Sequence, residues 1–254
     1  MTEPSSRTEQ LFYEVFESLP RQGPGNREAT GRALAACQGL PDCPRILDLG
    51  CGVGAQTLDL AALTKGDIIA VDLHAPNIER LRDRIGVQGL SGRVTAEVGD
   101  FGALTLAPES FDLIWSEGAL YNLGLEHALY VCHRLLRPGG CLAFTDAVWR
   151  SEDPPADARA MFERDYPAMS NVVSDVVRAK AAGFELLDHF TLPDSAWWEA
   201  FYTPMLHEIA RLRDKYASDA ESLAALDEVA AEPAMHEKFG CHYAYEFFVC
   251  RRPA

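Results

Sequence analysis

The stretch that decides the fold is "RILDLGCGVGAQTLDLA", residues 45–61. It starts as an apolar run, breaks at Gly50, Gly52 and Gly54, and resumes with apolar residues at helical spacing. This pattern predicts a buried strand, a tight turn and a helix. At such a turn the free backbone N–H groups and the helix dipole attract a negative group, and the missing side chains let a ligand approach closely.

Working outward, seven segments have the pattern of strands, and amphipathic helical segments separate the first five. The strand segments are "RILDL" (45–49), "IIAVD" (68–72), "RVTAEV" (93–98), "FDLIWS" (111–116), "CLAFTD" (141–146), "FELLDHF" (184–190) and "YAYEFFVC" (243–250). The alternation predicts an α/β fold with a doubly wound, seven-stranded, mainly parallel sheet.

Two further regions are largely helical and lie outside this alternation. Residues 1–40 contain two helical segments joined by "PRQGPGN" (20–26), whose glycines and prolines predict a loop that moves. Residues 194–240 begin with an aromatic cluster and interrupt the path from the sixth strand to the seventh. We expect both regions to cover the carboxyl edge of the sheet, where open α/β folds bind ligands.

Composition narrows the class of protein. The chain has 254 residues, 48% of them hydrophobic, which fits a single α/β domain. It lacks a membrane-length apolar run and a secretory signal, so we expect a cytoplasmic protein that does not bind membranes. A formal net charge of −15 repels polyanions, which argues against nucleic acid as a partner. Seven cysteines without a CxxC pair indicate neither a disulfide framework nor a metal site.

The glycine-rich turn alone leaves two ligand classes open. Gly50, Gly52 and Ala55 also satisfy the glycine pattern of dinucleotide-binding enzymes. Asp72 ends the second strand, where a carboxylate accepts hydrogen bonds from ribose hydroxyls, and dinucleotide folds carry such an acid as well. Other motifs must separate a dinucleotide from another nucleoside ligand.

Four ordered motifs favour one family. "DLGCGVG", with Asp48 before the glycines, resembles motif I of the class I, Rossmann-like S-adenosylmethionine (SAM)-dependent methyltransferases. In that family the acid organises the methionine end of SAM. The resemblance assigns Asp100 of "GDFGAL" to the adenine amino group and places Phe101 beside the adenine ring. "FDLIWSEGALYNL" and "LLRPGGCLAF" match the later motifs in order, and the last strand resembles the antiparallel seventh strand of the family.

The resemblance implies a set of site residues, and no HxxxH or paired-carboxylate spacing in the sequence calls for a metal. The expected cofactor-binding residues are Asp48, Gly50, Cys51, Gly52, Gly54, Asp72, Leu73, Asp100, Phe101 and Ser116, and the expected catalytic residues are Glu117 and Tyr121. Only the backbone N–H of Cys51 is required, so its thiol is expected to be inert. The expected organisation is one SAM-dependent methyltransferase domain over residues 1–254, with a helical cover (1–40), a SAM-binding core (41–150) and a helical insertion (194–240).

The expected reaction is in-line transfer of a methyl group from SAM to a small-molecule acceptor, which needs mainly positioning and exclusion of water. Glu117 and Tyr121 follow the fourth strand, where the methyl group sits in this family; Glu117 would hold a cation or accept a proton. The alternative for Glu117 is a cap for the helix around "LGLEHAL". Further acceptor-side candidates are Asp146, Trp149, Tyr202, His207 and His242.

Three alternative functions stay open. The first alternative is a SAM-dependent enzyme of another reaction type, the second is an NAD(P) oxidoreductase, and the third is a noncatalytic SAM-binding subunit. The identity of the methyl acceptor and the oligomeric state stay open as well.

Overall fold

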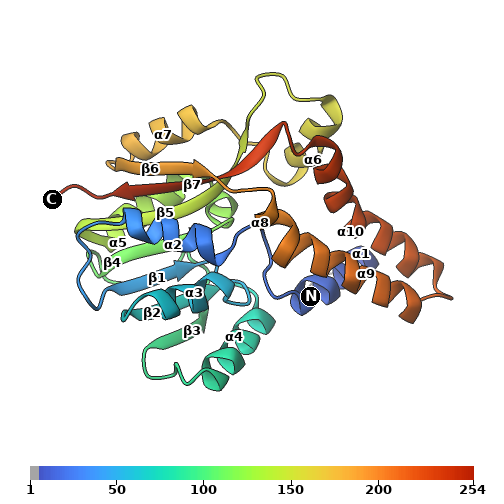
Figure 1. Cartoon of the computed structure of the whole chain (residues 1–254), viewed down its shortest axis with the longest axis horizontal. Coiled ribbons are helices and arrows are strands. Elements are labelled where there is room, and N and C mark those ends of the chain that lie inside the picture. The colour runs from blue at the N-terminus through green and yellow to red at the C-terminus, as the bar shows by residue number, and fades with distance from the viewer. Residues whose placement is uncertain (1–5) are drawn as a thin grey trace.

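The structure is a computed structural model and describes residues 6–254 (Figure 1). Seven strands form one sheet in the order β3-β2-β1-β4-β5-β7-β6. Strand β7 pairs antiparallel with β5 and β6, and the other pairings are parallel. The strands are β1 (Arg45–Leu49), β2 (Asp67–Asp72), β3 (Val94–Val98), β4 (Phe111–Glu117), β5 (Leu136–Trp149), β6 (Glu185–Thr191) and β7 (Tyr243–Arg251). The expected mainly parallel sheet with an antiparallel last strand is confirmed.

Strand β5 is longer than its apolar run indicates. The sequence predicts residues 141–146, whereas the strand begins at Leu136 and ends at Trp149. At its start the pairing with β4 shifts register, since Phe111 pairs with Leu136 but Leu113 pairs with Cys141. At its far end the pairing with β7 continues to Trp149, opposite Tyr243. Partner strands therefore extend β5 beyond the residues that look apolar.

Helices cover both faces of the sheet. One face packs against α2 (Arg27–Ala36), α3 (Ala55–Leu63) and α4 (Ala75–Val87). The other face packs against α5 (Leu125–Leu135) and α7 (Val172–Ala181). The 3₁₀ turn η1 (Leu120–Leu123) follows β4, and α6 (Ala156–Asp165) precedes α7. The sequence patterns considered above do not indicate α6 and α7.

A third apolar cluster lies beside the sheet. It is formed by α1 (Arg7–Ser18), α9 (Thr203–Lys215) and α10 (Ala220–Phe239) together with the start of β7. Figure 1 shows these three helices side by side, next to the edge at which the parallel strands end. The short α8 (Ser195–Trp197) and the π-helical turn η2 (Trp198–Tyr202) lead into α9.

The two regions expected to cover the sheet therefore pack against one another. Residues 7–18 meet the helices of 203–239 across the third cluster, so the two covers form one apolar unit. The first five residues of the expected cover 1–40 lie outside the described residues.

Candidate functional site

The glycine-rich turn between β1 and α3 has the backbone that the sequence predicts. Gly50, Gly52 and Gly54 have φ angles of 68°, 52° and 80°, which residues with a side chain rarely adopt. A Cβ on Gly50 would lie 2.2 Å from the Cβ of Ala119, and one on Gly54 would lie 2.1 Å from Cδ1 of Leu81. The turn is thus bare because its surroundings leave no room for side chains.

Two carboxylates flank this turn. Asp48 is fully buried and accepts hydrogen bonds from Thr57 Oγ1 at 2.5 Å and Gln56 Nε2 at 3.4 Å. Burial raises the pKa of Asp48 to about 7. Asp72, at the end of β2, accepts from the backbone N–H groups of Gly52 at 2.8 Å and His74 at 2.9 Å. Asp72 therefore holds the turn itself, and Asp48 holds the start of the helix that follows it.

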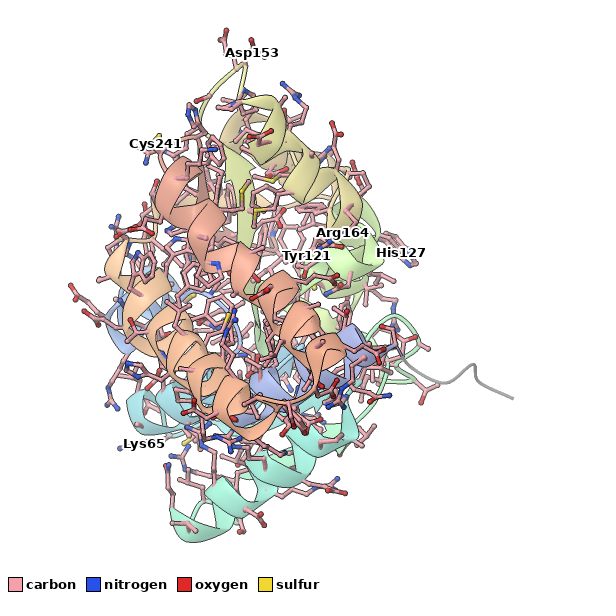
Figure 2. All side chains as sticks on the ribbon, turned by 90° about the vertical axis from the view of Figure 1, so that its right-hand side faces the viewer. Lys65, Tyr121, His127, Asp153, Arg164 and Cys241 are labelled. Carbon is pink, nitrogen blue, oxygen red and sulfur yellow. The ribbon has the colours of Figure 1, made fainter. Side chains whose placement is uncertain are left out.

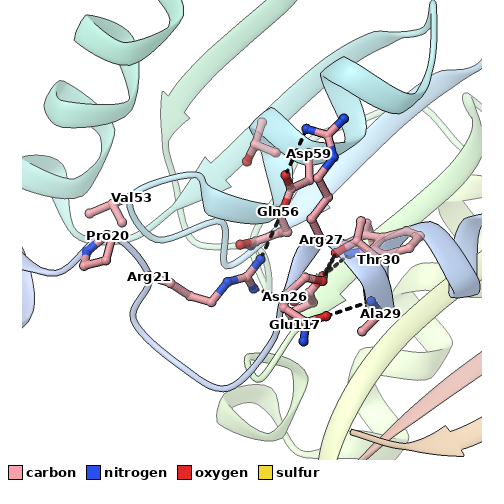
Figure 3. Close-up of polar contacts among 12 residues, drawn as sticks. Pro20, Arg21, Asn26, Arg27, Ala29, Thr30, Val53, Gln56, Asp59 and Glu117 are labelled. Carbon is pink, nitrogen blue, oxygen red and sulfur yellow. Dashed lines mark hydrogen bonds and ion pairs between the residues drawn. The ribbon is translucent and has the colours of Figure 1, made fainter. Parts of the chain in front are cut away.

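Glu117, at the end of β4, is the centre of a buried polar cluster (Figure 3). Its side chain is only 4% exposed, and Oε2 forms an ion pair with Arg21 Nη1 at 2.7 Å. Trp115 Nε1 and Thr30 Oγ1 donate to Oε1 at 2.8 and 3.1 Å. Arg21 also meets Asp59 of α3 at 3.5 Å. Glu117 makes no helix cap in this arrangement, and its carboxylate has three donors.

The loop over residues 20–26, named here the covering loop, lies directly on the glycine-rich turn. A Cβ on Gly52 would lie 2.7 Å from Oε1 of Gln22. The Gln22 amide donates to Asn77 Oδ1 of α4 at 2.8 Å, and Gly25 N donates to the Ala196 carbonyl at 3.0 Å. The loop thus connects the amino-terminal helices to both the core and the 194–240 region.

Arg21 and Gln22 were not among the expected site residues. Their segment predicts only a mobile connection, because its glycines and prolines dominate the pattern. A buried arginine in a loop is recognisable only when its partner is known, and Glu117 lies 96 residues away in sequence. A cavity of about 340 Å³ adjoins this pair and is lined by residues that include Arg21, Arg27, Asp59 and Arg84.

The remaining expected cofactor residues lie at the same edge in different environments. Leu73 is 73% exposed. Asp100 is exposed and its Oδ1 accepts from Gly102 N at 2.8 Å, while the neighbouring Phe101 is partly buried. Ser116 is buried and donates to the Leu49 carbonyl at 2.9 Å, which ties β4 to β1. Cys51 is buried, and burial raises the pKa of its thiol well above the usual value, which keeps the thiol protonated.

The acceptor-side candidates divide into two groups. Tyr121 stacks near Tyr166 with ring centroids 5.0 Å apart, and burial raises its pKa. The candidates Asp146, Trp149 and Tyr202 are buried or partly buried around the same third cluster. His207 and His242 are placed elsewhere: His207 lines a surface groove beside Leu19 and Arg211, and His242 contacts Ser151 at 2.9 Å.

Residues 6–254 show neither a metal-binding cluster nor a membrane-spanning helix. In this part of the chain no group of three or more His, Cys, Asp or Glu side chains is arranged to hold a metal ion. Nor does any helix in it have the length and apolar character to cross a bilayer.

Comparison with known proteins shows which protein family and which relatives this chain resembles. A family model described as "Methyltransferase domain" matches residues 46–140. The chain is 36% identical over 107 residues to methyltransferase GfsG of Streptomyces halstedii, covering 42% of this chain and 38% of that protein. It is 35% identical over 109 residues to dimethylglycine N-methyltransferase of Parasynechococcus marenigrum (42% and 39%). It is 28% identical over 184 residues to sterol 24-C-methyltransferase erg-4 of Neurospora crassa (69% and 48%). The chain spans less than half the length of each of these relatives.

Solved structures share the fold over nearly the whole chain. A SAM-dependent methyltransferase from Geobacter sulfurreducens, in complex with S-adenosylhomocysteine, superposes with a TM-score of 0.82 at 18% identity, covering 95% of this chain and 97% of that one. The [4+2]-cyclase SpnF superposes with a TM-score of 0.74 at 22% identity, covering 98% and 93%. The family model shows that residues 46–140 form a methyltransferase domain, and the solved structures show that the chain as a whole has the class I, Rossmann-like fold of SAM-dependent methyltransferases.

Proposed function

We propose that the protein transfers a methyl group from SAM to a small-molecule acceptor. The observation that carries this proposal is the bare turn of Gly50, Gly52 and Gly54 flanked by the carboxylates of Asp48 and Asp72. A nucleoside with an amino-acid tail needs backbone that it can approach closely, and it needs acids for its ribose hydroxyls and its ammonium group. The residues present fit SAM in both respects.

When bound, SAM supplies an activated methyl group on a sulfonium. Asp72 is suited to the ribose, because it lies at the end of β2 on the far side of the turn. Asp100 and Phe101 are proposed for the adenine, and Leu73, next to Asp72, lies within the same edge. Asp48, whose buried carboxyl has no cationic partner among residues 6–254, is suited to the cationic part of the cofactor.

Glu117 is placed to hold a cation. Its carboxylate is bound by an arginine, an indole N–H and a hydroxyl, which fix its position at the end of β4. Together, Arg21 and Glu117 present one cation and one anion 2.7 Å apart, which is the complement of an α-amino acid zwitterion. We propose that this pair binds the amino-acid end of SAM and that Tyr121 lies on the acceptor side.

The proposed organisation has one domain. Residues 41–150 bind the cofactor, and the covers in residues 6–40 and 194–240 close the site and exclude water. A small acceptor fits a net charge of −15 better than a nucleic acid does, because a polyanion is repelled.

Calorimetry and product mass test the proposal together. The protein should bind SAM and S-adenosylhomocysteine, and it should add the mass of one methyl group to an acceptor in a screen with labelled SAM. Binding of NADH without a SAM signal would contradict the proposal in favour of an oxidoreductase. SAM binding with a product of another mass would show a different SAM-dependent reaction, and binding without turnover over a broad panel would indicate a noncatalytic subunit.

A further inference from the structure

Five tyrosines belong to the third apolar cluster or pack against it, and they are named here the tyrosine wall. They are Tyr121, Tyr166, Tyr202, Tyr243 and Tyr245, from η1, the segment after α6, η2 and β7. Tyr245 lies against the residue that follows Glu117, since a Cβ on Gly118 would be 3.1 Å from its Cε1. Trp197 extends the wall, with its ring centroid 5.1 Å from that of Tyr245. An aromatic surface therefore begins where β4 ends.

Two carboxylates belong to this wall. Asp146 of β5 is 1% exposed and accepts from the Tyr166 hydroxyl at 2.7 Å. Glu232 of α10 is partly buried and accepts from the Tyr202 hydroxyl at 2.9 Å. Burial, and to a lesser extent the negative charges of both acids, raise the pKa of Tyr121 and of Tyr245. Both carboxylates are thus within electrostatic reach of the two phenols nearest the proposed transfer site.

Neither carboxylate forms an ion pair within residues 6–254. Two other buried carboxylates do: Glu117 has Arg21 at 2.7 Å and Asp175 has Arg178 at 2.8 Å. The charge of Arg164 reaches Glu232, but that side chain is 82% exposed and bound to Asp165. Burying carboxylates without a cation is costly, and burial raises the pKa of Asp146 to about 7 and that of Glu232 above its usual value, so a bound cation would supply the counter-charge that ionises them.

A second observation also points to a ligand at this place. Thr145 lies beside Glu117 in the pairing of β5 with β4 and is almost fully buried. Its hydroxyl has no hydrogen-bond partner among the described residues. An unmade hydrogen bond in the interior costs free energy, and a polar group of a bound molecule would remove that cost.

We propose that the tyrosine wall, with Asp146 and Glu232, binds the methyl acceptor as a cation, namely a protonated amine; this rests on the methyltransferase function proposed above. Tyrosine faces attract ammonium groups, and the attraction grows when water is excluded. The carboxylates supply the opposite charge. Figure 2 labels Tyr121 and Arg164 on the side of the molecule that this view presents.

The chemistry of an amine also uses the carboxylates. A protonated amine has no lone pair, so one N–H proton first passes to the carboxylate of Asp146 or Glu232. The freed lone pair forms the N–C bond as the S–C bond of SAM breaks. The products would be the methylated ammonium ion, which takes over the positive charge of the sulfonium, S-adenosylhomocysteine and the protonated carboxyl group, which returns its proton to solvent.

The test compares a cation with its neutral isostere on the protein saturated with S-adenosylhomocysteine. Choline and 3,3-dimethylbutan-1-ol have the same shape and differ in charge. We expect choline to bind about tenfold tighter or more, measured by calorimetry or ligand-detected NMR. Glu232→Gln should abolish this preference, and so should Asp146→Asn, while the affinity for S-adenosylhomocysteine stays the same. Glu237→Gln, an exposed change on the same helix, should keep the preference.

The outcomes separate this inference from the proposed function. If S-adenosylhomocysteine binds but choline shows no advantage over its isostere, or if both carboxylate variants keep the advantage, the cation site is wrong and methyl transfer stands. Absence of S-adenosylhomocysteine binding would overturn both. Because two separate carboxylates are tested, a folding defect in one variant leaves the other decisive.

Discussion

At the scale of single residues, the ion pair between Arg21 and Glu117 is the main addition to the site. Both side chains are at least 94% buried, which is costly for charges unless each has a partner. The pair therefore creates a strong local electric field at the end of β4. A ligand with both an ammonium and a carboxylate can replace each partner with an equivalent charge, whereas a neutral ligand cannot.

Glu117→Gln is the corresponding prediction. Removing the negative charge should lower the affinity for S-adenosylhomocysteine by roughly 10- to 100-fold, the range for a hydrogen bond to a charged group. The affinity for 5′-methylthioadenosine, which lacks the amino-acid end, should change little. Calorimetry with both ligands measures the two effects, and Glu126→Gln on exposed α5 surface is the matched control. Equal loss for both ligands would mean that Glu117 supports the nucleoside site or the fold.

The positions of the acids that lie near the glycines in sequence or at the end of the neighbouring strand could be predicted from the sequence. A strand that leads into the turn puts Asp48 next to Gly50, and the parallel neighbour β2 ends with Asp72 at the same edge. Arg21 and Gln22 could not be placed this way, because tertiary packing alone brings their loop onto the turn. The roles of the expected site residues remain predictions that the binding experiments test.

At the scale of elements, helix α4 fastens the covering loop. Arg80 donates to the carbonyls of Leu19 at 2.7 Å and Ser18 at 3.1 Å, at the end of α1. Arg84 donates to the Val53 carbonyl at 2.7 Å, inside the glycine-rich turn, and to the Pro20 carbonyl at 3.5 Å. One helix thus holds both the loop and the turn beneath it, so the loop opens only when these bonds break.

The covering loop must open to admit a cofactor and should become more firmly closed once it is bound. We expect amide hydrogen exchange in residues 8–30 to slow when SAM is added. The Gly25 N–H, which donates to Ala196, is the most direct reporter of closure. Exchange in α7, on the opposite face of the sheet, serves as the internal control. The same protection with and without SAM would show that the segment is a static part of the fold.

The strands and helices could be predicted from the local sequence pattern to different extents. The seven strands were recognisable because each carries its own apolar run, and all seven are present. The ends of β5 were not, since its pairing with β4 and β7 extends it. Helices α6 and α7 have few buried residues, so their apolar signal is weak. The π-helical turn η2 lies inside an aromatic run that fits a regular helix equally well.

At the scale of the whole molecule, the fold buries the acids Asp48 and Asp146 in addition to three apolar clusters. Burial raises the pKa of both Asp48 and Asp146 from 3.8 to about 7. The folded protein therefore holds protons on these groups at a pH where the unfolded chain has released them. Stability contributed in this way is present at low pH and is lost as pH rises from about 4 to about 7.

We accordingly expect these two groups to make the free energy of unfolding fall with pH across that window, by at most ~1.4 kcal/mol per pH unit for each proton. Urea unfolding at several pH values measures the slope. Asp146→Asn should reduce the slope, because the amide does not titrate, whereas Asp153→Asn on the exposed surface should leave it unchanged. An identical slope in Asp146→Asn would mean that Asp146 is ionised in the folded protein throughout.

The packing of α1 on α10 also determines when the structure around the site is completed during synthesis. Thr8 of α1 donates to Glu228 of α10 across 220 residues of chain. At the usual ~5–20 residues per second, a ribosome needs roughly 10–40 s to make the partner of a helix that has already emerged. During that interval the strands around the glycine-rich turn lack the packed unit of α1, α9 and α10. The site is therefore completed late in biosynthesis, when α9 and α10 have been made and can pack on α1.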